Sequence, residues 1–298
     1  MLSVLMITYN QERFIAQALD SVLMQEVDFV YEIVIGDDCS SDSTRSILLD
    51  YQQKFPDRIR LLLPEKNQGA MRNFVSVLKA CQGEYVATLE GDDFWTCPYK
   101  MQNQVDFLAS QPDFVMCFTN SLIVDEDGTT IKEDRLDKDR RKHLSQVEIL
   151  SGLVPPTNTV VFRNKVIKVV PDVYLSCING DILFFSSLTG YGDAGYIDRH
   201  TASYRVHEGG IWSKKSEEYM KKNTLKTRLA LLHTFASDYR SILLPQVQWS
   251  YLDLMRYYIE KREIREYIKA VTGYFLSNAR YGMLPVRKVS VASERDRL

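Results

Sequence analysis

Cysteine is scarce in this sequence, and its few cysteines form no recognisable pair. There are five in 298 residues, an odd number with wide spacing and no Cys-x-x-Cys. That pattern is typical of reduced thiols rather than of a disulfide framework or a zinc site. We therefore expect a cytoplasmic protein whose cysteines are mostly small core residues.

Long apolar runs and an excess of positive charge are missing as well. No stretch approaches the roughly 20 apolar residues that a membrane-spanning helix needs. The apolar start at residues 1–8 has neither a basic leader nor a cleavage site, so any membrane contact should be peripheral. The formal net charge of −2 provides no basic field for nucleic acid, which we exclude as a partner.

The glycine-rich phosphate loops of common nucleotide-binding proteins are also absent. No Gly-x-Gly-x-x-Gly follows the first apolar run, and no Gly-x-x-x-x-Gly-Lys-Ser/Thr occurs. This excludes a phosphate held in the usual Rossmann or P-loop way. A metal-dependent nucleotidyltransferase is an alternative function, but it would need a glycine-rich, basic loop that residues 5–13 do not provide.

What is present is an alternation of apolar strands and amphipathic helices. The expected strands are 2–8, 31–36, 58–63, the stretch 85–95, 114–121, 159–162 and 195–206, and a helix follows each of the first four. This order predicts an α/β fold with a mostly parallel, Rossmann-like sheet flanked by helices. The pattern becomes wholly helical from Ser216 onward, which predicts a catalytic domain over 1–212 and a helical C-terminal appendage over 213–298.

Polar side chains follow the ends of the first four expected strands. They are Thr8, Tyr9 and Asn10, then Asp37 and Asp38, then Asn67, and finally Glu90, Asp92 and Asp93. The carboxyl ends of parallel strands share one edge of a sheet, where ligands bind. Adjacent carboxylates at that edge repel one another, so they require a divalent metal or a basic partner. An isolated Asp-Asp would otherwise be a solvated acidic turn.

An acidic site can bind an anionic diphosphate only through a cation, which predicts a nucleoside diphosphate carried on Mn²⁺ or Mg²⁺. Asp38 could accept a hydrogen bond from uracil, thymine or guanine, whereas adenine has no imino proton to donate. A diphosphate attached to a sugar is a leaving group, and its displacement requires a base. Asp181, at the start of an expected helix, is either that base or an acid favoured by the helix dipole.

Together these residues resemble the ordered motifs of the family 2 glycosyltransferases, which have the GT-A fold. The matching motifs are Thr8-Tyr9-Asn10, the run 37–44, Asn67-Gln68-Gly69 with Arg72-Asn73, Gly91-Asp92-Asp93 and Asn179-Gly180-Asp181. The resemblance covers residues 1–212. It implies a metal-dependent hexosyltransferase that moves a sugar with inversion, usually from a UDP-sugar, to a glycan or lipid-linked glycan acceptor in surface polysaccharide or glycoconjugate assembly.

The resemblance also implies roles for single residues. Asp38 would contact the base, Asp92 the ribose or diphosphate, and Asp93 the metal, with Asp181 as the general base. The rest of the donor pocket would be formed by Thr8, Tyr9, Asn10, Asn67 and Arg72.

Three further positions carry an expectation. His207 resembles a histidine of bacterial members that could reach the diphosphate or metal, or else close over the site as a loop residue. Glu90 stands where many members have aspartate, and Cys39 where glycine or asparagine is common.

Features outside these motifs leave several alternatives open. A protein with this fold could also be a non-catalytic nucleotide-sugar-binding scaffold. The mixed charges over 133–143 predict a solvated loop, with a lid over the acceptor as the alternative. The basic, aromatic tail from Tyr274 could contact an anionic membrane surface, which would place the protein at the inner face of a membrane. A homo-oligomer is also left open.

Overall fold

The computed structural model consists of two units, Met1–Lys214 and Lys215–Leu298. The described residues are 1–298 except 165, 168–169, 178, 211–214 and 283–298. The predicted boundary between 212 and 213 falls outside the described residues, and so does the predicted tail from Met283 onward.

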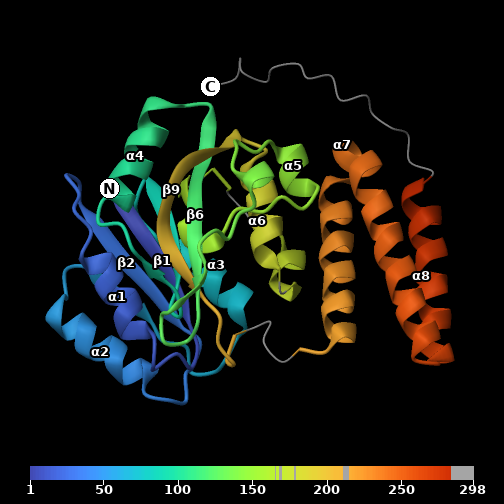
Figure 1. Ribbon diagram of the computed structural model, residues 1–298, viewed down its shortest axis with the longest axis horizontal. Coiled ribbons are helices and arrows are strands. Elements are labelled where there is room, and N and C mark those ends of the chain that lie inside the picture. Colours follow the sequence, from blue (N-terminus) through green and yellow to red (C-terminus); the bar gives the residue numbers. More distant parts are fainter. Residues whose placement is uncertain (165, 168–169, 178, 211–214, 283–298) are drawn as a thin grey trace. The chain divides into compact units, whose positions relative to one another are not determined.

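A mixed sheet forms the centre of the first unit (Figure 1). The strand order is β3-β2-β1-β4-β8-β6-β9-β5, and β7 pairs with β6. The strands are β1 (Leu2–Thr8), β2 (Tyr31–Asp37), β3 (Ile59–Leu62), β4 (Tyr85–Glu90), β5 (Phe94–Trp95), β6 (Phe114–Val124), β7 (Thr130–Lys132), β8 (Val161–Arg163) and β9 (Asp193–Arg205). The first four strands are parallel to one another, whereas β8 runs antiparallel between β4 and β6.

Helices cover both faces of this sheet (Figure 1). One face carries α1 (Ile15–Leu23), α2 (Thr44–Lys54) and α4 (Lys100–Ser110), and the other carries α3 (Ala70–Ala80), α5 (Gln146–Leu150) and α6 (Gly180–Leu188). The short helices η1 (Lys138–Arg140), η2 (Thr157–Thr159) and η3 (Asp172–Ser176) lie in the connections. Val4 and Met6 of β1 belong to one apolar cluster and Leu5 to the other, which explains the continuous apolar run of this strand.

The second unit is helical. It contains α7 (Glu217–Glu260), which is kinked at Tyr239, and α8 (Ile264–Gly282), which packs on α7. Ser216 caps α7 by accepting a hydrogen bond from the Tyr219 N–H. In the described part of the chain, no helix combines the length and the apolar character needed to cross a bilayer.

Candidate functional site

The carboxyl ends of the central strands bring three polar loops together. Thr8 lies opposite Asp37 in the register of β1 and β2, and Ile7 lies opposite Glu90 in β4. The Asp38 N–H donates to the Thr8 carbonyl at 3.0 Å, and the Gly91 N–H donates to the Ile7 carbonyl at 3.0 Å. The loops after β1, β2 and β4 therefore start side by side.

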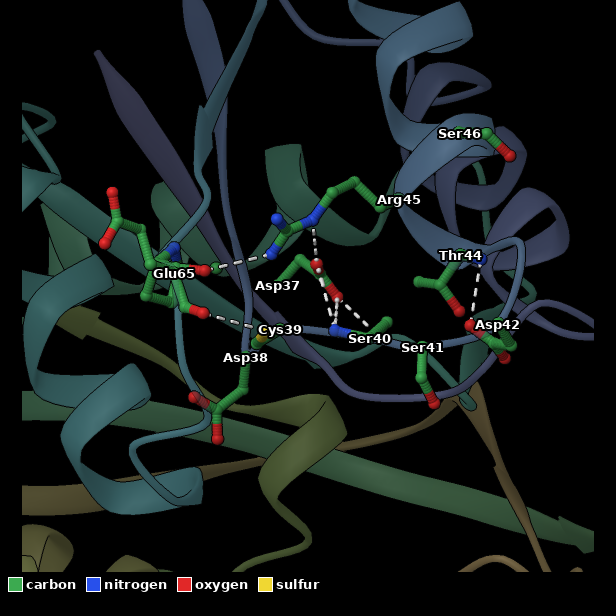
Figure 2. A network of polar contacts seen from close by, with 12 residues as sticks. Asp37, Asp38, Cys39, Ser40, Ser41, Asp42, Thr44, Arg45, Ser46 and Glu65 are labelled. Carbon is green, nitrogen blue, oxygen red and sulfur yellow. Dashed lines mark hydrogen bonds and ion pairs between the residues drawn. The ribbon is translucent and has the colours of Figure 1, made fainter.

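Asp37 organises the loop after β2 (Figure 2). This fully buried carboxylate pairs with the Arg45 Nε at 2.8 Å and accepts hydrogen bonds from the backbone N–H and the hydroxyl of Ser40. The side chain of Asn10 accepts the Ser41 N–H at 2.8 Å, which ties this loop to the loop after β1. Cys39 lies within the turn at a left-handed φ of 64°.

Asp38 faces the loop after β3. Its two carboxylate oxygens accept the backbone N–H groups of Gln68 at 2.7 Å and of Gly69 at 2.8 Å. The side chain of Asn67 donates to the Asp38 carbonyl at 3.0 Å. A carboxylate oxygen can accept more than one hydrogen bond, so Asp38 keeps the capacity to bind a further donor.

Glu90 and Asp93 form the most strongly perturbed part of the site. Burial raises the pKa of Glu90, and together with the charges of Asp92 and Asp181 it brings this pKa to about 8. Burial also raises the pKa of Asp93 well above its usual range, with Asp92 and Glu90 adding to the effect. Asp93 accepts the Arg205 N–H at 2.8 Å through Oδ1, while its buried Oδ2 has no hydrogen-bond partner among the described residues.

Asp181 lies in the first turn of α6. Its carboxylate accepts the Ile182 N–H at 2.9 Å and a hydrogen bond from the side chain of Thr157. Burial raises the pKa of Asp181. Because the charge of Asp181 also raises the pKa of Glu90, the predicted base and the acids after β4 share one electrostatic environment.

His207 pairs with Asp92. Its Nε2 lies 3.1 Å from the Asp92 Oδ2, and its ring meets the ring of Phe14 edge-on at 4.7 Å. The side chain is only 7% exposed. His207 thus contacts Asp92, the predicted ribose or diphosphate residue.

The other predicted donor residues differ in their exposure. Thr8 is buried at the end of β1, whereas Tyr9 is 47% exposed. Arg72 is exposed in the first turn of α3.

Two arginines that the sequence analysis did not single out enter the site. Arg205 is buried and donates from Nε to the Asp92 carbonyl at 2.9 Å and from Nη1 to the Glu126 carbonyl at 2.7 Å. It therefore fixes the turn that carries the acids. In the sequence, Arg205 could have been found from its place two residues before His207, in the run Tyr204-Arg205-Val206-His207.

Arg135 supplies positive charge to the acids. Its guanidinium stacks on the Tyr204 ring at 3.9 Å, and its Nη1 lies 3.5 Å from the Asn158 Oδ1. Its charge lowers the pKa values of Glu90, Asp93 and Asp181 against the effect of burial. The acids at this edge of the sheet therefore have a basic partner. In the sequence, nothing distinguishes Arg135 from the other charged residues of the run 133–143.

The acids also fit a divalent cation. A buried carboxylate oxygen without a partner, flanked by two further acids, is stabilised when a cation offsets its charge. Asp92, Asp93 and His207 offer oxygen and imidazole donors of the kind that Mn²⁺ accepts. The described residues contain no preformed group of three such side chains able to hold a metal alone. A donor diphosphate would have to supply further ligands.

Comparison with known sequences gives a consistent result. The sequence model described as glycosyl transferase family 2 matches residues 3–170. An uncharacterized protein of Mycobacterium tuberculosis is 34% identical over 211 residues, which cover 71% of this chain and 60% of that protein. Two further mycobacterial relatives match in the same way, so the chain spans about 60% of the length of these three curated relatives.

Two solved structures share the architecture. Residues 1–349 of Staphylococcus aureus TarS, in complex with UDP-GlcNAc, match with a TM-score of 0.66 and 20% identity over 93% of this chain and 81% of that one. The mannosyltransferase PcManGT from Pyrobaculum calidifontis, in complex with GDP-Man and Mn²⁺, matches with a TM-score of 0.58 and 17% identity over 95% and 76%. At these identities the likeness shows the GT-A fold.

Proposed function

The chain belongs to glycosyltransferase family 2, and from this premise we propose that it transfers a hexosyl group with inversion from a nucleotide-diphosphate donor to an acceptor hydroxyl. The observation that carries the proposal is the shared environment of Glu90, Asp92, Asp93 and Asp181 at the end of the parallel strands. The loops with Asp38 and Asn10 border the same strand ends. A donor and a base can therefore serve one reaction.

The donor is a UDP-sugar in this proposal. The carboxylate of Asp38 is oriented by two backbone N–H groups and can still accept the imino N–H of uracil. Guanine would fit the same acceptor, and the two structural neighbours bind UDP-GlcNAc and GDP-Man. Thr8, Tyr9, Asn10, Asn67 and Arg72 complete the donor pocket.

Asp93, Asp92 and His207 would hold Mn²⁺ or Mg²⁺ together with the donor. The cation would offset the charge of the departing diphosphate. The protein prepares this step by burying Asp93 and by fixing its turn through Arg205.

Asp181 takes the proton from the acceptor hydroxyl as that oxygen attacks the anomeric carbon. Thr157 and the Ile182 N–H orient its carboxylate, and burial raises its pKa, which makes it a stronger base than an exposed aspartate. The acceptor class, a glycan or lipid-linked glycan in surface polysaccharide assembly, rests on the family resemblance alone.

A donor screen tests this function. Purified protein is incubated with UDP-, GDP- and dTDP-sugars, with and without Mn²⁺, and release of the nucleotide is measured. We expect metal-dependent hydrolysis of UDP-sugars. Asp181→Asn should leave UDP binding by calorimetry nearly unchanged while turnover falls on the order of 100-fold or more.

Asp50→Asn, an exposed change on α2, is the matched control and should behave as the unmodified protein. UDP binding without hydrolysis or transfer for any donor would instead identify a non-catalytic scaffold. Unchanged turnover in Asp181→Asn would remove Asp181 from the reaction.

A further inference from the structure

One face of α8 exposes large apolar side chains. Ile264, Ile268 and Phe275 follow one another at helical spacing and are 73%, 57% and 65% exposed. Leu276 lies beside them and is 64% exposed. The opposite face contains the buried residues of the helix, which are Ala270, Ser277 and Tyr281. The apolar stripe is therefore not the face that packs on α7.

Such a stripe is unusual for a helix in water. Single exposed apolar residues are common, but several on one face of a helix mark a surface that binds something. We define the stripe as Ile264, Ile268, Phe275 and Leu276. Since α8 is not apolar enough to cross a bilayer, a lipid surface could receive the stripe only with the helix lying along it.

A row of basic residues accompanies the stripe. Arg265, Lys269 and Arg280 lie beside it at helical spacing, and the side chain of Lys269 is 59% exposed. Glu266 is the one acid in the sequence of α8. It pairs with Lys269 at 2.5 Å and lies 3.9 Å from Lys222, so it offsets the charge of Lys269, whereas Arg265 and Arg280 have no ion pair among the described residues. The exposed face is thus apolar and basic.

We propose that this face of α8 docks the protein on an anionic lipid surface, with the stripe in the headgroup region and the basic row on acidic headgroups. The charge pattern favours this partner over a second copy. A symmetric dimer through the same face would bring the unpaired Arg265 and Arg280 of the two copies close together, and like charges in an interface are repulsive. The inference goes beyond the proposed transferase function and does not depend on it.

Vesicle co-sedimentation of the full chain tests the inference. Vesicles of phosphatidylcholine alone are compared with vesicles that also contain phosphatidylglycerol, at low and at high salt. We expect binding to the anionic vesicles only, and weaker binding at high salt because the exposed charges are screened. Arg265→Gln with Arg280→Gln should weaken binding about fivefold for each charge removed.

Ile268→Ser with Phe275→Ser should weaken vesicle binding about tenfold or more, because apolar side chains no longer enter the interface. Leu49→Ser is the matched control, since Leu49 is 46% exposed on α2 of the first unit. It should bind as the unmodified chain does. Circular dichroism checks that each variant is folded.

Three outcomes would overturn the inference. They are equal binding to neutral and anionic vesicles, no binding to either, and a dimer in sedimentation that the stripe variant dissociates while vesicle binding is absent. Donor hydrolysis without vesicles is measured in parallel and should not change in the α8 variants. Failure of the docking surface is thereby separated from failure of the transferase proposal.

Discussion

Cys39 occupies a backbone position that is unfavourable for its side chain. Its φ of 64° is left-handed, and only glycine, and to a smaller degree asparagine and aspartate, adopt it easily. Cys39→Asn should therefore raise the free energy of unfolding by about 1 kcal/mol, and Cys39→Val should lower it by at least about as much. Urea denaturation measures both.

Cys97→Asn is the control for Cys39, because Cys97 is not among the non-glycine residues with positive φ. Cys97→Asn should not raise the free energy of unfolding, because no backbone strain is relieved at this position. If Cys39→Val were as stable as the unmodified protein, the turn would be free to relax, and the strain argument would be wrong.

Arg135 offers a second test at the scale of one residue. Its charge opposes the effect of burial on Asp181, so Arg135→Gln should raise the pKa of that carboxyl further. The acidic limb of the pH profile of kcat/KM should then move to higher pH, because more alkaline solution is needed to ionise the base. Arg135→Lys should keep the limb closer to its original position.

Lys138→Gln is the matched control for Arg135, since it removes an exposed charge from the same run of residues. It should leave the profile in place. A limb that does not move in Arg135→Gln would show that Arg135 acts by holding Tyr204 and Asn158 rather than through its charge.

At the scale of elements, Lys100 makes α4 sensitive to pH. It is fully buried, lies 4.3 Å from the Trp95 ring and donates to the Gln104 Oε1 at 2.6 Å. Burial lowers its pKa to about 7, whereas the unfolded chain keeps the ordinary value of about 10.4. Between these values the unfolded chain binds more protons, so the contribution of Lys100 to stability rises with pH and is level below about 7.

Lys100→Met should therefore flatten the rise of Tm between about pH 7 and about pH 10. Thermal unfolding followed at several pH values in this window measures it. Lys79→Met, an exposed change on α3, should leave the rise unchanged. An equal slope in Lys100→Met and the unmodified protein would contradict the assignment.

Some strands of the sheet could be predicted from the sequence, and others could not. The strands ending at Thr8, Asp37 and Glu90 were foreseen because buried parallel strands are continuous apolar runs with polar ends. The antiparallel position of β8 between β4 and β6 could not be predicted, because strand pairing depends on contacts between distant residues. The charge run 133–143 was expected to be solvated, yet Leu136 is buried and its N–H donates to the Asn120 side chain at 2.9 Å.

For the whole molecule, the rule that ligands bind at strand ends predicts where the candidate site lies, but not the contacts inside it. The sequence alone does not distinguish the contacts of the adjacent Asp37 and Asp38. The structure shows that Asp37 pairs with Arg45, whereas Asp38 faces the loop after β3. Arg205 reaches Asp92 from 113 positions away. A local sequence pattern can mark a residue such as Arg205, but it does not show which distant residue that side chain contacts.

The acids at the end of β4 and after it make the stability of the first unit depend on pH and on metal binding. Glu90 has its pKa raised to about 8 from an ordinary 4.5, and Asp93 is also raised, so the folded chain binds more protons than the unfolded chain in this range. The contribution of Glu90 to stability is full below about pH 4.5 and is lost as pH rises toward about 8, and the contribution of Asp93 is lost in the same direction.

A cation at Asp93 would offset the charge that causes this loss. Mn²⁺ with UDP should therefore raise Tm more at pH 8 than at pH 5, because protonated carboxyls do not bind metal. In Asp93→Asn the increment from Mn²⁺ should vanish, while UDP alone still protects through the Asp38 loop. Asp50→Asn should keep the full increment. An increment of equal size at both pH values, or one that survives in Asp93→Asn, would place the cation away from these acids.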